Sequence, residues 1–70
     1  MTEAVAPMVG RIIAINVKVG DTISENDSIA TIEAMKLEMP IPSPASGTVK
    51  EIKVSVGDQV EADQVIAVIE

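Results

Sequence analysis

One lysine is marked by its neighbours as a residue that could take part in chemistry. Lys36 lies in the stretch Glu-Ala-Met-Lys-Leu-Glu-Met, which spans residues 33–39. An apolar, β-branched run (29–32) precedes this stretch and a proline-rich segment (40–44) follows it, a pattern that indicates a short turn between two strands. The amine of a lysine at the tip of such a turn is solvated, mobile and open to an approaching enzyme.

The residues on either side of Lys36 are unusual for the exposed end of a turn. Met35 and Leu37 are apolar at positions where polar residues are expected. Exposed apolar side chains can serve as contacts for a partner protein, and methionine adapts to varied surfaces. The alternative is that Met35 or Leu37 folds back onto the core.

The absence of several residue types limits the chemistry of the chain. Its 70 residues include no His, Cys, Phe, Tyr or Trp. Ser-His-Asp and Cys-His nucleophile arrangements are therefore impossible, as are thiolate and imidazole metal sites. The 11 acidic residues form no spaced ligand set such as a calcium-binding loop. We expect neither catalytic residues nor a metal site.

The net charge of −6 disfavours an anionic partner. Nucleic acids and anionic membranes both attract basic surfaces. No run approaches the roughly 20 apolar residues of a membrane span, and the first residues of the sequence show no basic region followed by an apolar stretch. We expect no nucleic-acid partner, no membrane insertion and a cytoplasmic location.

The chain contains an internal repeat. Residues 7–33 align without gaps with residues 44–70 at an offset of 37, with 11 identities in 27 positions. Proline, glycine and Gly-Asp pairs fall in register between the two copies. We therefore expect one domain over residues 1–70, built from two copies of one β unit.

Both copies have the same strand pattern. Apolar and polar residues alternate over 13–19 and again over 51–56, which predicts two half-buried strands. Ile12 and Val49 break the alternation at equivalent places and predict a β-bulge in each copy.

Turn residues follow at equivalent positions. Gly-Asp pairs end the strands at 20–21 and 57–58, and further turns are expected at 25–27 and 62–64. No window has a helical apolar period. The sequence predicts an all-β fold, a flattened barrel or sandwich of two four-stranded sheets related by a pseudo-two-fold axis. Since the equivalent of Lys36 is position 73, beyond the chain end, the Lys36 hairpin and the termini should lie at opposite ends.

The stretch around Lys36 resembles the Glu-Ala-Met-Lys-Met motif of the biotinyl/lipoyl attachment domain family, with Leu37 in place of the second methionine. The resemblance covers nearly the whole chain. Ala-Pro-Met-Val-Gly (6–10), the paired Val-Gly-Asp turns and Ser-Pro-Ala-Ser-Gly (43–47) are similar to further family segments. Residues 20–29 leave no room for the extra "thumb" loop of some members, so the resemblance implies a thumbless domain of the biotin carboxyl carrier type.

The resemblance implies that Lys36 is covalently biotinylated by biotin protein ligase, which supplies the base that deprotonates the amine. The residues it implies as contacts for the ligase or other partners are Glu33, Ala34, Met35, Leu37 and Glu38. The domain would carry a carboxyl group, as carboxybiotin, from a biotin carboxylase to a carboxyltransferase or decarboxylase subunit. The resemblance thus implies a non-catalytic carrier whose cofactor is biotin.

Two alternatives remain open from the sequence. Lipoyl carrier domains share the architecture, but their motif usually reads Asp-Lys-Ala, and Met35 and Leu37 argue against it; attachment of both groups stays open. The second alternative is an unmodified structural barrel, in which Lys36 would be an accident within a matching motif. The acceptor substrate is not encoded in a carrier sequence.

Overall fold

The fold is built entirely from β-strands. The computed structural model describes residues 2–70. Its strands are β1 (Thr2–Val5), β2 (Gly10–Ile15), β3 (Thr22–Ile23), β4 (Ser28–Ala34), β5 (Leu37–Pro42), β6 (Gly47–Ile52), β7 (Gln59–Val60) and β8 (Val65–Ile69). Ile and Val favour such strands because β-branched side chains fit a pleated surface. The predicted all-β class is confirmed.

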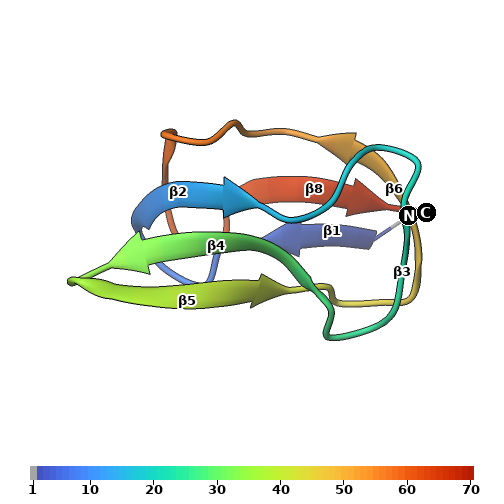
Figure 1. The fold of residues 1–70 in the computed structure, drawn as a ribbon, viewed down its shortest axis with the longest axis horizontal. Coiled ribbons are helices and arrows are strands. Elements are labelled where there is room, and N and C mark those ends of the chain that lie inside the picture. The colour runs from blue at the N-terminus through green and yellow to red at the C-terminus, as the bar shows by residue number, and fades with distance from the viewer. Residues whose placement is uncertain (1) are drawn as a thin grey trace.

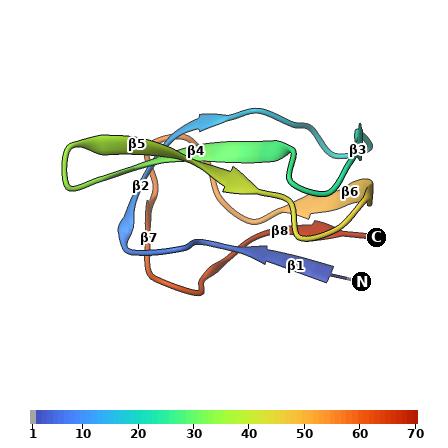
Figure 2. The ribbon, with the colours of Figure 1, turned by 90° about the horizontal axis from the view of Figure 1, so that it is seen from below.

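The strands form two four-stranded antiparallel sheets, with the orders β1-β8-β6-β3 and β5-β4-β2-β7. Figure 2 shows the two sheets as layers, one above the other. The molecule measures 31 × 18 × 18 Å along its principal axes, so the sandwich is elongated along its strands. This is the predicted architecture.

The two sheets correspond strand by strand. A shift of 37 residues moves β2, β3 and β4 onto β6, β7 and β8, and it moves β1 onto 39–42 within β5. The same shift converts one sheet order into the other, so the predicted pseudo-two-fold symmetry is confirmed. The bulges are equivalent too, since the register slips between Ile12 and Ala14 and again between Val49 and Glu51.

An aspartate side chain stabilises each of the two Gly-Asp turns in the same way. Asp21 Oδ2 accepts a hydrogen bond from the backbone N–H of Lys18, and Asp58 Oδ2 accepts one from Ser55, each at 2.9 Å. Gly20 and Gly57 have φ of 97° and 96°, a region that glycine enters without steric cost. The predicted Gly-Asp turns are therefore confirmed.

The long strands end earlier than predicted. The sequence pattern extends them through Val19 and Val56, but β2 ends at Ile15 and β6 at Ile52, and both valines are 62% exposed. After Ile15 the chain crosses to the other sheet, where β3 pairs with β6. Alternation persists through this crossing because Val17 still packs against the core. The alternation therefore indicates that one side of the segment is buried, and it does not show that the segment pairs within a sheet.

Aliphatic side chains fill the space between the sheets. The largest of the fully buried side chains are Ile12, Ile29, Ile32, Ile41, Ile66, Ile69, Val49 and Val60. Each fully buried side chain of this size contributes about 1.5–3 kcal/mol. The buried hydroxyl of Ser43 donates to the carbonyl of Ala45, so this polar group is satisfied within the core.

The β4–β5 hairpin projects from one end of the molecule. Its tip is the leftmost point of Figure 1, whereas the start of β1 and the end of β8 lie together at the opposite end. This is the predicted arrangement of the hairpin and the termini. Within residues 2–70, no helix is long and apolar enough to cross a membrane.

Candidate functional site

Lys36 occupies the second position of a tight turn. Ala34 pairs with Leu37 across β4 and β5, which leaves only Met35 and Lys36 to reverse the chain. Their φ angles are 52° and 65°. Two left-handed residues are the requirement of a type I′ turn, whose twist matches that of the flanking strands. Asn, Asp and Gly usually fill these positions, because other L-residues pay roughly 1–2 kcal/mol each for this conformation.

The apolar neighbours of Lys36 face solvent. Met35 is 90% exposed and Leu37 is 65% exposed. The alternative in which either side chain folds back onto the core is therefore wrong. The hairpin tip therefore presents two largely exposed apolar side chains, which is the property of a surface that contacts other molecules.

The other predicted contact residues lie below the tip. Ala34 is buried, so its side chain anchors the end of β4 and offers a partner little contact area. Glu33 and Glu38 are directly opposite each other on β4 and β5, an arrangement of like charges that destabilises a strand pair. Arg11 lies opposite Glu33 on β2, and its Nη2 donates to Glu33 Oε1 at 3.3 Å. This cation offsets the repulsion between the two carboxylates.

The amine of Lys36 is unengaged. Among residues 2–70 it takes part in no ion pair or side-chain hydrogen bond. An exposed, unpaired amine on a protruding turn fits covalent attachment of a group to its Nζ, because an enzyme can reach it without displacing any part of the domain.

A shallow depression lies beside the Lys36 end of the hairpin, and it includes residues that no sequence pattern marked as a site. Met8, Val9 and Arg11 line it together with Met35. Gly10 permits the close approach of β2 and β4, since a Cβ at this position would meet the backbone oxygen of Glu33 at 2.7 Å. The Ala-Pro-Met-Val-Gly segment (6–10) was noted for its similarity to the family, but the sequence alone did not place that segment next to Lys36.

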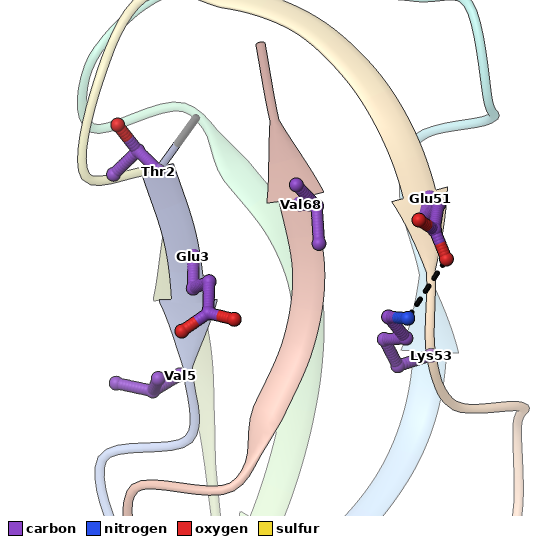
Figure 3. Close-up of a pocket in the computed structure, with 6 residues that line it drawn as sticks. All are labelled: Thr2, Glu3, Val5, Glu51, Lys53 and Val68. Carbon is purple, nitrogen blue, oxygen red and sulfur yellow. Dashed lines mark ion pairs between the residues drawn. The ribbon is translucent and has the colours of Figure 1, made fainter.

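A second depression lies on the outer face of the other sheet. Figure 3 shows Val68, on β8, between Glu3 on β1 and the ion pair of Glu51 with Lys53. Glu51 lies on β6, and Lys53 directly follows the end of that strand. Lys53 Nζ is 2.8 Å from Glu51 Oε2. The hydrogen bond from Lys53, followed by its charge, lowers the pKa of Glu51, and the same bond raises the pKa of Lys53. None of the predicted site residues lies here.

Comparison with known proteins gives a consistent family. A family model described as "Biotin-requiring enzyme", which covers biotin and lipoyl domains, matches residues 2–69. The biotin carboxyl carrier protein of Streptococcus mutans is 49% identical over 57 residues, 81% of this chain and 44% of that protein. The dihydrolipoyllysine-residue acetyltransferase component of the pyruvate dehydrogenase complex of Cupriavidus necator is 44% identical over 59 residues, 84% of this chain and 11% of that protein. The chain thus spans less than half the length of each of these two relatives.

The structural comparison agrees with the sequence comparison. The urea carboxylase of Kluyveromyces lactis contains a region that superposes with a TM-score of 0.93 at 36% identity, covering 99% of this chain and 6% of that chain. The chain therefore belongs to the biotin/lipoyl attachment domain family, whose members are non-catalytic carriers of covalently bound biotin or lipoate.

Proposed function

We propose that Lys36 is biotinylated by a biotin protein ligase and that the domain then carries a carboxyl group between a biotin carboxylase and a carboxyltransferase or decarboxylase. The observation that carries this proposal is the position of Lys36 at the protruding tip of the β4–β5 turn, with its amine unengaged.

The attachment step makes one demand on the domain, which is an accessible amine. Lys36 Nζ attacks the acyl carbon of an activated biotinyl-adenylate, an amide bond forms and AMP leaves. The proton of the amine goes to a base of the ligase, because no residue of the hairpin accepts a hydrogen bond from Lys36. The product has lost one positive charge, which takes the formal net charge from −6 to −7.

The flanking residues would provide the contact surface for the ligase. Met35 and Leu37 expose apolar side chains on both sides of the amine, and burying them against a partner contributes favourable free energy. The left-handed backbone of Met35 and Lys36 restricts the turn to one shape. A preformed turn lowers the ordering cost of binding.

The remainder of the domain would act as a carrier. Bound biotin supplies the atom that accepts and releases the carboxyl group, and the domain supplies the tether. Because the hairpin points away from both termini (Figure 1), a segment joined at the termini would leave the hairpin free to reach two partners. Tethering raises the local concentration of the carried group at each partner site.

Lipoate is the second candidate, and the similarity to an acetyltransferase component of pyruvate dehydrogenase favours it. The biotin carboxyl carrier relative, the urea carboxylase neighbour and the Met-Lys-Leu sequence support biotin. Under the lipoate alternative the same lysine would carry an acyl group.

Co-expression with each ligase separates the two candidates. The domain is produced with a biotin protein ligase or with a lipoate ligase, and its intact mass and streptavidin binding are measured. We expect a biotin-sized increment and streptavidin binding with the first enzyme. A lipoyl-sized increment alone would transfer the proposal to the second candidate, and no increment with either enzyme would overturn both.

A further inference from the structure

The depression beside the hairpin is lined by apolar side chains from two distant parts of the chain. Met8 and Val9 come from the segment before β2, Ala34 is the last residue of β4, and Met35 is the first residue of the turn. Its polar lining residues are Arg11, Glu33 and Gln59, and we call the Arg11–Glu33 ion pair its rim. Met35 belongs both to the depression and to the turn that presents Lys36, so the attachment point and the depression share a residue.

The internal symmetry indicates that the fold does not require these apolar residues. The 37-residue shift moves Met8 onto Ala45 and Val9 onto Ser46. Ser46 has a local structural role, since its Oγ accepts a hydrogen bond from the backbone N–H of Glu25. The same backbone is therefore compatible with a small and a polar residue at the end far from Lys36. Only the copy next to Lys36 has exposed apolar side chains at these positions.

The rim adds polar groups of both signs. Arg11 Nη2 and Glu33 Oε1 are 3.3 Å apart, and their side chains are 61% and 41% exposed. A guanidinium can donate to a carbonyl oxygen and a carboxylate can accept from N–H groups. A cyclic urea presents a carbonyl oxygen and two N–H groups, so the rim and a cyclic urea have complementary hydrogen-bonding groups.

We propose that the biotin attached to Lys36 folds back into this depression. Its hydrocarbon arm and thioether ring lie on Met8, Val9 and Met35, and its urea edge lies at the Arg11–Glu33 rim. This inference rests on biotinylation of Lys36 and adds a resting position for the attached group. In this position the ring is partly withdrawn from solvent between visits to partner enzymes.

The test compares the unmodified, biotinylated and acetylated domains by NMR, with 15N labelling and 13C-labelled methionine methyl groups. Acetylation of Lys36 also forms an amide and removes the charge, but it adds no ring. We expect biotinylation, beyond the effect of acetylation, to shift the Met8 methyl and the Val9 and Arg11 amide signals. We also expect cross-relaxation between the ring protons and the Met8 methyl.

The matched variant exchanges Met8→Ala and Val9→Ser, the residues that the second copy has at these positions. We expect this variant to lose the additional shift at Arg11 and to be captured severalfold faster by avidin. Val19→Ser is the control, because Val19 is also an exposed valine but lies outside the depression. Its neighbour Gly20 donates a backbone hydrogen bond to Val49 of the other sheet. It should leave both readouts unchanged.

The outcomes separate this inference from the proposed function. Absence of any biotin increment in the mass spectrum contradicts biotinylation itself. A biotinylated domain whose additional shifts are confined to 35–37 overturns the docking while biotinylation stands. Shifts at Met8 and Val9 that require an added ligase or carboxylase assign the depression to a protein partner and also overturn it.

Discussion

Met35 and Lys36 are adjacent residues that both have left-handed backbone conformations, with φ of 52° and 65°. Neither is a residue that adopts this region readily, so the turn stores strain at the point where the domain presents its lysine. The two flanking strands impose this conformation, because their backbones are paired at Glu33–Glu38 and at Ala34–Leu37. This strained backbone conformation fixes the direction in which the chain reverses.

Relief of this strain gives the first prediction. Met35→Asn should raise the free energy of unfolding of the unmodified domain by about 1 kcal/mol, because Asn tolerates the left-handed region and the Met35 side chain has little packing to lose. Urea unfolding followed by far-UV circular dichroism measures the change. Leu37→Asn is the control and should give no gain, since Leu37 has no positive φ. Equal or lower stability of the Met35→Asn variant would contradict the strain argument.

Gly10 should be essential for the packing at the base of the hairpin. A Cβ at this position would lie 2.7 Å from both the Glu33 carbonyl oxygen and Ile32 Cγ1. Gly10→Ala should therefore displace β4 and lower the free energy of unfolding by about 1–3 kcal/mol. Its amide spectrum should change at Ile32 and Glu33. Val9→Ala, at the exposed neighbouring position, should have a much smaller effect, and unchanged stability of Gly10→Ala would show that the backbone can adapt.

The Glu51–Lys53 pair predicts a defined pH dependence. The pKa of Glu51 is lowered in the folded state, so its contribution is present above the ordinary value of 4.5 and is lost as the pH falls through the lowered pKa. The pKa of Lys53 is raised, so its contribution is present below 10.5 and is lost as the pH rises through the raised pKa. Because both groups are solvent-exposed, the effect on stability should be small and screened by salt.

A carboxyl NMR titration checks this pair. Lys53→Met should move the pKa of Glu51 upward towards 4.5, whereas Lys18→Met should leave it in place. Identical Glu51 titrations in the wild type and in Lys53→Met would refute the assignment of the shift to Lys53.

The apolar flanks of Lys36 should determine which ligase recognises the hairpin. The double exchange Met35→Asp and Leu37→Ala gives the Asp-Lys-Ala sequence that is usual in lipoyl domains. Because it removes two exposed apolar contacts, we expect biotinylation to fall about tenfold or more, since each 1.4 kcal/mol corresponds to a factor of ten. Lipoylation should rise or stay unchanged. The rates are compared by intact mass with each purified ligase, and an unchanged biotinylation rate would exclude the flanks as contacts.

The architecture could be predicted from the sequence because the internal repeat constrained the fold. Ile12 and Val49 marked both bulges, and the Gly-Asp pairs marked both turns, since each signal occurs twice at one offset. The strand ends could not be predicted, because Val17 and Val54 continue to bury one side after the chain has left its sheet. At the site, the place of Lys36 on a turn followed from the sequence, whereas the exposure of Met35 and Leu37 was settled only by the structure. Met8 and Val9 could not be placed at the site, because only the folded sheets bring them next to Met35.

Intact mass spectrometry of the purified domain, after incubation with biotin protein ligase, biotin and ATP, shows whether Lys36 is the residue that takes the biotin. We expect one biotin-sized increment that is absent from Lys36→Arg and retained in Lys18→Arg, Lys50→Arg and Lys53→Arg. The four variants conserve charge, so they differ only in which amine is removed. An unmodified wild-type domain, or an increment that persists in Lys36→Arg, would contradict the assignment of Lys36 as the attachment residue.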